Sequence, residues 1–155
     1  MTSTRTFRFR LAGLSISAPL TWKRPAFINR LIHPSRPAIF GPGGPGYEFI
    51  WFDKPMVFKK KPEFKHSEMA NHLIGIVQVR GNRILGEGTI TVNNQDFPTI
   101  TFEKHRVGYA PTTMKRYLIV LNNKLFTIGA RLSHNNIDCY SEEGYDKIIQ
   151  SIKKI

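Results

Sequence analysis

Apolar and polar residues alternate over two short stretches near the amino terminus, residues 7–11 and residues 14–18. Successive side chains of a β-strand point to opposite faces, so this two-residue period predicts two strands, which Gly13 separates. Residues 1–20 also resemble a secretory or organelle-targeting signal, because arginines precede an apolar stretch. The alternation favours two strands of the mature fold over a targeting segment.

Residues 47–52 give a stronger strand signal, with the sequence Tyr-Glu-Phe-Ile-Trp-Phe. Aromatic and β-branched residues fit a pleated, half-buried surface, so we expect this strand to lie centrally in a sheet. Residues 53–65 contain Pro55, Pro62 and a run of lysines. They therefore predict a solvated connection.

The second half of the chain predicts two β-hairpins, because apolar strand segments there flank short polar turns. The paired segments are residues 88–93 with 97–103, around residues 94–96, and residues 115–121 with 124–132, around Asn122 and Asn123. Asparagine tolerates a positive φ better than most residues, so the Asn-Asn pair is acceptable in a type I′ turn.

One helix is expected to begin at Ser67 and to end near Arg80 and Gly81. Serine is a favoured cap at the start of a helix, and Glu68 meets the positive end of the helix dipole. An apolar stripe at helical spacing would face the core, and it consists of Met69, Leu73, Ile76 and Val77.

Residues 141–155 predict a closing helix with Ser141 as its cap. Its first turn holds Glu142 and Glu143, and its expected last turn holds Lys153 and Lys154. These charges follow the helix dipole. The apolar stripe consists of Tyr145, Ile148, Ile149 and Ile152.

The length of 155 residues, with 41% hydrophobic and 22% charged residues, is that of one globular domain. We therefore expect residues 1–155 to form a single α+β domain in which an antiparallel β-sheet is flanked by helices, an α/β/α sandwich. No stretch approaches the ~18 apolar residues that a membrane-spanning helix needs. One cysteine fits a reducing compartment, so we expect a cytoplasmic protein, with organelle targeting or export as the alternative.

Two short motifs and the order of the expected elements resemble the PsbP-like family, which includes photosystem II extrinsic proteins, bacterial DcrB proteins and a Ran-binding nuclear-transport factor. The first motif, in residues 15–22, ends in Pro-x-x-Trp, and the second, in residues 145–152, reads Tyr-Asp-x-Ile-x-x-Ser-Ile. The resemblance implies an antiparallel sheet between helices, no catalysis, and a role in docking to or stabilising a larger assembly. No residue here matches a manganese, calcium or Ran contact of the family.

Positive charge is concentrated in the first part of the chain. Twelve of the first 65 residues are Lys or Arg and three are Asp or Glu, so nine of the twelve net positive charges lie there. Such a surface suits phosphate, anionic membrane or an acidic protein. The expected partner-binding residues are Arg36, Lys59, Lys60, Lys61 and Lys65 as charge donors, with Phe40 and Tyr47 as anchors.

The sequence offers little for catalysis or metal binding. The segment 41–46 has the G-x-G-x-x-G spacing, but its prolines remove backbone donors, so we expect a rigid surface turn. Cys139 has no histidine within motif distance, and the five histidines have no metal-ligand spacing. We expect no enzyme activity, no cofactor and no metal.

These observations predict a non-catalytic accessory or adaptor protein that binds an acidic protein or a membrane-associated assembly through a basic face. The alternative is a nonspecific or single-stranded nucleic-acid-binding protein. In that case the same lysines would neutralise phosphates, and Phe58 and Phe64 would offer stacking faces.

Overall fold

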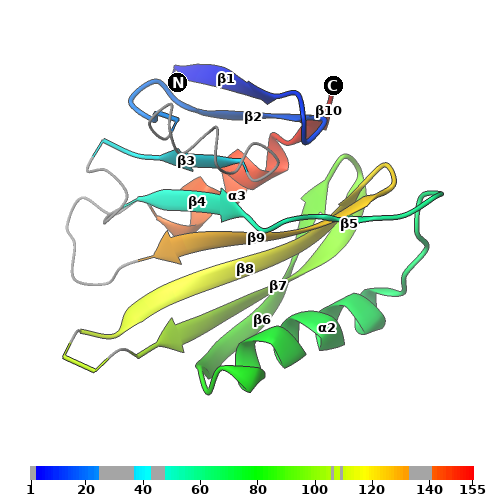
Figure 1. Cartoon of the computed structure of the whole chain (residues 1–155). Coiled ribbons are helices and arrows are strands. Elements are labelled where there is room, and N and C mark those ends of the chain that lie inside the picture. The colour runs from blue at the N-terminus through cyan, green and yellow to red at the C-terminus, as the bar shows by residue number, and fades with distance from the viewer. Residues whose placement is uncertain (1–2, 25–36, 43–47, 106, 109, 133–140) are drawn as a thin grey trace.

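Two long antiparallel hairpins form the middle of the main sheet (Figure 1). The structure is a computed structural model, and it describes residues 3–24, 37–42, 48–105, 107–108, 110–132 and 141–155. The hairpin strands are β6 (Arg83–Val92) with β7 (Gln95–Lys104) and β8 (Thr112–Leu121) with β9 (Lys124–Leu132). Both predicted hairpins are confirmed.

Asparagines make the turns of both hairpins. Asn93 and Asn94 have φ values of 52° and 62°, and Asn122 has a φ of 58°. Asparagine adopts this left-handed region more readily than most residues, and a two-residue turn of this kind matches the twist of the paired strands. The first turn therefore lies at Asn93 and Asn94, and the prediction of residues 94–96 was wrong by a small shift.

Three shorter strands extend the main sheet beyond β9. They are β3 (Ala38–Phe40), β4 (Phe49–Phe52) and β5 (Met56–Val57). The order is β3-β4-β9-β8-β7-β6, and β5 pairs with the other end of β9. Strand β4 is paired on both sides, so the strand predicted in residues 47–52 is confirmed in its described part, although the connection after it contains β5.

A second sheet is made of β1 (Thr4–Phe9), β2 (Leu14–Pro19) and β10 (Lys153–Lys154) in the order β1-β2-β10. Gly13, between the first two strands, has a φ of 76°, which suits glycine. The alternation near the amino terminus therefore identified two strands correctly.

Helix α2 (His66–Val79) follows β5 and packs on β6, β7 and β8. Its buried residues are Met69, Leu73 and Val77, three of the four residues of the predicted apolar stripe, and the fourth, Ile76, is half-buried. The helix begins one residue before Ser67, and Lys65 occupies the cap position without a side-chain hydrogen bond. The prediction of a serine cap was wrong because the chain is already helical at His66.

Helix α3 (Glu142–Gln150) covers the opposite face of the main sheet (Figure 1). The Ser141 hydroxyl accepts a hydrogen bond from the Gly144 backbone N–H at 3.1 Å, so the predicted cap is confirmed. The structure is thus an antiparallel sheet with a helix on each face, as expected. Within the described ranges, neither helix has the length and apolar character that crossing a membrane requires.

The closing helix is shorter than predicted. It ends at Gln150, and Lys153 and Lys154 lie in strand β10 instead of in a last helical turn. The Ser17 backbone N–H donates to the Ser151 hydroxyl at 2.8 Å, and that hydroxyl lies 3.1 Å from the Ser17 carbonyl oxygen. These bonds hold the chain against β2 and make a strand more favourable than another turn.

A buried lysine joins α3 to the sheet. The Lys115 ammonium on β8 lies 2.8 Å from a carboxylate oxygen of Glu142 and 3.0 Å from one of Asp146. The Tyr117 hydroxyl donates to the same Asp146 oxygen at 2.6 Å. Burial, followed by the bond to Asp146, raises the pKa of Tyr117 above its usual range. The phenol therefore stays a donor, and Asp146 is the centre of the network.

We expect Asp146→Ala to reduce the free energy of unfolding by about 2–3 kcal/mol, because it leaves the buried Tyr117 hydroxyl without its acceptor and Lys115 with one carboxylate. Urea denaturation followed by circular dichroism would measure the change. The matched control is Glu143→Ala on the same helix, where the side chain is 82% exposed. A loss for Asp146→Ala no larger than that of the control would contradict the role of the network.

Candidate functional site

The predicted lysines Lys59, Lys60, Lys61 and Lys65 lie between β5 and α2, in a segment that we call the lysine loop (residues 58–65). All four are exposed, and none of their side chains forms an ion pair or hydrogen bond with another residue that the structure describes. Lys65 also stands at the positive end of the α2 dipole, where a cation is disfavoured. These charges contribute nothing evident to the fold and are free to meet a partner.

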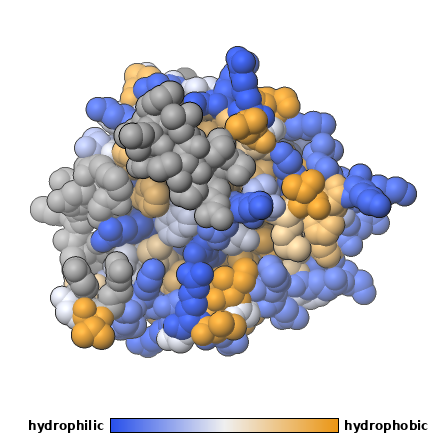
Figure 2. Space-filling view, viewed as in Figure 1, coloured by the Kyte–Doolittle hydropathy of each residue, from blue (hydrophilic) through white to orange (hydrophobic). Residues whose placement is uncertain are grey.

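Strand β5 places two apolar side chains beside the lysine loop. Met56 is 52% exposed and Val57 is 65% exposed. Figure 2 shows apolar surface gathered over β5, bordered by hydrophilic side chains. The sequence analysis missed this patch because it treated residues 53–65 as a solvated connection. The signal was the pair of apolar residues between Pro55 and Phe58.

Two aromatic residues of the lysine loop contact each other. The rings of Phe58 and Phe64 meet edge to face with their centroids 5.8 Å apart. Phe58 also packs against the hydrophobic core, and Phe64 is 37% exposed. The contact between the two rings supports the loop. The rings are therefore not both free to stack on the bases of a nucleic acid.

Phe40 lies in an aromatic row on the sheet face that α2 also occupies. Its ring centroid is 6.0 Å from that of Phe49, which stacks on Trp51 at 5.3 Å. Phe49 pairs with Arg131 at one end of β9, whereas β5 pairs with Lys124 at the other end. Seven residues at ~3.3 Å each separate these ends by roughly 23 Å.

The structure therefore does not bring Phe40 together with the predicted lysines. Arg36 and Tyr47, the other two expected partner-binding residues, lie outside the described residues. Whether Phe40 contacts a partner stays a prediction.

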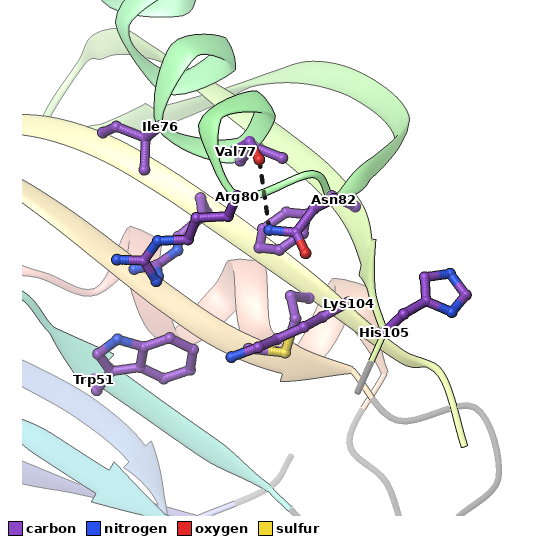
Figure 3. A pocket seen from close by; sticks show the side chains of 10 residues that line it. Trp51, Ile76, Val77, Arg80, Asn82, Lys104 and His105 are labelled. Atoms are coloured by element: carbon purple, nitrogen blue, oxygen red, sulfur yellow. Dashed lines mark hydrogen bonds between the residues drawn. The ribbon is translucent and has the colours of Figure 1, made fainter. Parts of the chain in front are cut away.

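A pocket of about 180 Å³ lies where the carboxyl end of α2 meets the main sheet. Five residues give this basic pocket its cations and aromatic rings. Three lie on the strands β4, β7 and β8, one follows α2 and one follows β7: Trp51, Lys104, Arg116, Arg80 and His105. Figure 3 shows the head groups of Arg80 and Lys104 directed toward the indole of Trp51. The sequence analysis missed this cluster, because strand pairing assembles it from positions that share no local motif.

Arg116 is the buried cation of the basic pocket, with a side chain 10% exposed. Its Nη1 donates to Asp53 at 3.1 Å, and its guanidinium lies 4.9 Å from the centroid of the Trp51 ring. Its Nε is buried and has no hydrogen-bond partner. Burial is the main cause that lowers the pKa of Arg116; the Asp53 carboxylate opposes it and the Arg80 charge adds to it.

Gly129 on β9 makes room for Trp51. A Cβ atom at position 129 would lie 2.2 Å from Cζ2 of the indole, so the ring rests directly on the glycine backbone. Phe49 stacks on the same indole and the Arg116 guanidinium lies over it, so Trp51 is held between side chains of β4, β8 and the β9 backbone.

The histidines show no metal site in the described part of the chain. His66 contacts the Thr89 hydroxyl at 3.3 Å, and His105 lies 2.5 Å from the Glu103 carboxylate. No group of three or more His, Cys, Asp or Glu residues that could hold a metal ion occurs among the described residues. His33, His134 and Cys139 lie outside them.

No family model and no curated protein sequence matches this chain. A solved structure does match: the solution structure of cyanobacterial PsbP (CyanoP) from Synechocystis sp. PCC 6803 aligns with a TM-score of 0.67. The alignment covers 100% of this chain and 94% of that chain, at 10% sequence identity. This chain has a PsbP-like fold.

A crystal structure from Bacteroides thetaiotaomicron VPI-5482 also matches, with a TM-score of 0.63 and 8% identity. The match covers 100% of this chain and 49% of that one, so the chain spans about half of its length. At such identities the PsbP-like fold is shared but the residues of a site are not, so the basic pocket must be judged on its own chemistry.

We expect Gly129→Ala to destabilise the protein by about 1–3 kcal/mol, because the added methyl group must displace the Trp51 indole. Tryptophan fluorescence should shift together with the melting temperature. Gly86→Ala is the matched control in the same sheet, since a Cβ there meets nothing within 4 Å. Equal stability of the two variants would show that Trp51 is not held against β9.

Proposed function

We propose that this protein is a non-catalytic accessory or adaptor protein that docks onto an acidic face of a larger assembly. The observation that carries the proposal is the group of four unpaired lysines beside the exposed apolar strand β5. Unpaired cations accelerate association with an acidic surface, and a neighbouring apolar contact slows dissociation. Both are present on one segment of the chain.

The geometry of this segment suits protein docking. Protein interfaces combine an apolar centre with a polar rim, and here Met56 and Val57 would form the centre while the lysines form the rim. The inner contact of Phe58 with Phe64 supports the loop. The resemblance to PsbP-like proteins, which implies docking to an assembly, points in the same direction.

Nucleic-acid binding is the alternative that the same lysines permit. It would use Phe58 and Phe64 as stacking faces, but their rings contact each other and Phe58 packs on the core. Without two free rings, the segment offers mainly phosphate neutralisation. A protein partner is therefore the better proposal, in a cytoplasmic setting that the single cysteine favours.

Reversing three charges tests the docking surface. We expect the triple variant Lys59→Glu, Lys60→Glu, Lys61→Glu to lose the partners that copurify with the wild-type protein from its native source, because like charges would then face each other across the interface. Quantitative mass spectrometry of both pulldowns measures the loss. The variant should keep its melting temperature within a few degrees, since these side chains are exposed and form no ion pair or hydrogen bond with a described residue.

The matched control reverses three exposed lysines on α3 and β10, with Lys147→Glu, Lys153→Glu and Lys154→Glu. The net charge changes by the same amount, but the lysine loop is intact. An unchanged partner list for the lysine-loop variant, or equal losses for both variants, would overturn the proposal. Single-stranded RNA or DNA binding whose affinity falls linearly on a log-log plot against salt would favour the alternative.

A further inference from the structure

The basic pocket holds more positive charge than the surrounding protein neutralises. Three cations line it, namely Arg80, Lys104 and Arg116, and among the described residues one carboxylate, Asp53, is bonded to one of them, Arg116. Asp53 itself does not line the pocket. His105 also lines it, but its ring is paired with Glu103.

Local structure explains part of this charge. Arg80 follows the last turn of α2, where a cation is stabilised by the negative end of the helix dipole. The dipole does not account for Lys104, which comes from the end of β7, or for Arg116 on β8. Among the described residues, Lys104 therefore has no counter-ion, and Arg116 has one, the Asp53 carboxylate.

Arg116 also has donor capacity that the fold does not use. Its Nη1 is bonded to Asp53, its Nη2 forms no hydrogen bond with a described residue, and its buried Nε has no partner. Leaving a buried charged group partly unsatisfied costs stability. The guanidinium nevertheless lies against the Trp51 ring. Its unused donors are therefore already positioned for a ligand.

We propose that the basic pocket binds a dianionic phosphate group. The three cations outnumber the one carboxylate that is bonded to Arg116 among the described residues, and a phosphate monoester, which carries a charge of about −1.5 to −2 at neutral pH, would supply the missing negative charge. The head groups of Arg80 and Lys104 both enter the pocket beside Trp51 (Figure 3). Arg116 of β8 also lines it. Guanidinium groups bind phosphate oxygens through paired donors.

The remaining walls indicate what the phosphate is attached to. Ile76, Val77, Phe102 and Met114 supply apolar surface beside the cations. A phosphate monoester with a small apolar or aromatic group would use both parts of the pocket, whereas free phosphate would use the cations alone. The phosphate monoester and free phosphate share the same phosphate chemistry, and a titration with each of them distinguishes the two.

This site is independent of the proposed docking surface. The lysine loop precedes α2 and the basic pocket lies at the other end of the helix, whose 14 residues at ~1.5 Å each span about 21 Å. Substitutions at one end therefore leave the other end intact, so the two proposals can fail separately.

Calorimetric titration with phenyl phosphate, inorganic phosphate and benzoate tests the proposal at ~50 mM salt, where electrostatic binding is weakly screened. We expect saturable one-site binding of phenyl phosphate, and binding of benzoate weaker by about tenfold, because the carboxylate carries one charge. Inorganic phosphate binding as tightly as phenyl phosphate would identify free phosphate as the ligand chemistry. No saturation with either phosphate, or benzoate binding equally well, would overturn the assignment.

Two exposed residues serve as variants, because Arg116 is buried and its loss could unfold the protein. Arg80→Gln and Lys104→Gln should each weaken phenyl phosphate by about tenfold. Lys61→Gln removes the same charge from the lysine loop and should leave the affinity unchanged. Equal weakening by Lys61→Gln would show attraction to the net charge of the chain, and the proposal would be wrong.

Fluorescence gives a second readout located in the pocket. The chain has two tryptophans, so Trp22→Phe leaves Trp51 as the reporter. Phenyl phosphate should change its emission with the same affinity that calorimetry gives on the wild-type protein. A calorimetric signal with no change at Trp51 would place the ligand elsewhere and overturn the proposal, and the wild-type emission provides the same test if Trp22→Phe does not fold.

Discussion

The width of the main sheet is the constraint on which the rest of the structure depends. Neighbouring strands lie about 4.8 Å apart and a helix is about 10 Å wide, so one helix cannot cover a sheet of seven strands. Helix α2 packs on β6, β7 and β8. On β4 and β3 the same face is occupied by the rings of Phe40, Phe49 and Trp51, and the Arg116 guanidinium of β8 lies over the Trp51 ring. The basic pocket lies between the part of this face that the helix covers and the part that these aromatic side chains cover. At this boundary Arg116 is buried by its neighbours and still lines the pocket.

Two neighbouring residues of β8 show how differently the two faces treat a buried cation. Lys115 points toward α3 and lies between two carboxylates, those of Glu142 and Asp146. Arg116 points toward α2, where it meets one carboxylate and the charge of Arg80. The first arrangement is neutralised and stabilises the attachment of α3. In the second arrangement, burial lowers the pKa of the Arg116 guanidinium, and its Nε has no hydrogen-bond partner. Since a buried charge is expensive unless it is paired, the α2 face carries a cost that binding of an anion would relieve.

The sequence pattern was sufficient to predict the elements that depend on residues close together in the chain. The alternation in β1 and β2, the turn at Asn122 and Asn123 and the Ser141 cap all depend on neighbours in sequence, and all were predicted. The end of α3 was not, because Ser151 is bonded to Ser17, 134 positions away, and that contact decides between helix and strand. The pocket fails prediction for the same reason: Trp51 meets Arg116 only through the pairing of β4 with β9 and of β9 with β8. The lysines were visible in the sequence, but their separation from Phe40 follows from which end of β9 each strand joins.

The two basic regions differ in how far their charges are fixed, and this difference bears on what each can recognise. A net charge of +12 attracts any anion to the surface and so raises association rates without selecting a partner. The lysines of the loop, exposed and unpaired, act in this way, and selectivity there must come from the apolar contact with β5. Arg116 is held by Asp53, by Trp51 and by burial before any ligand arrives, so little conformational entropy remains to be lost on binding. A buried donor flanked by two exposed cations discriminates by geometry as well as by charge. A site for one kind of anion requires this, and a surface that only attracts partners does not.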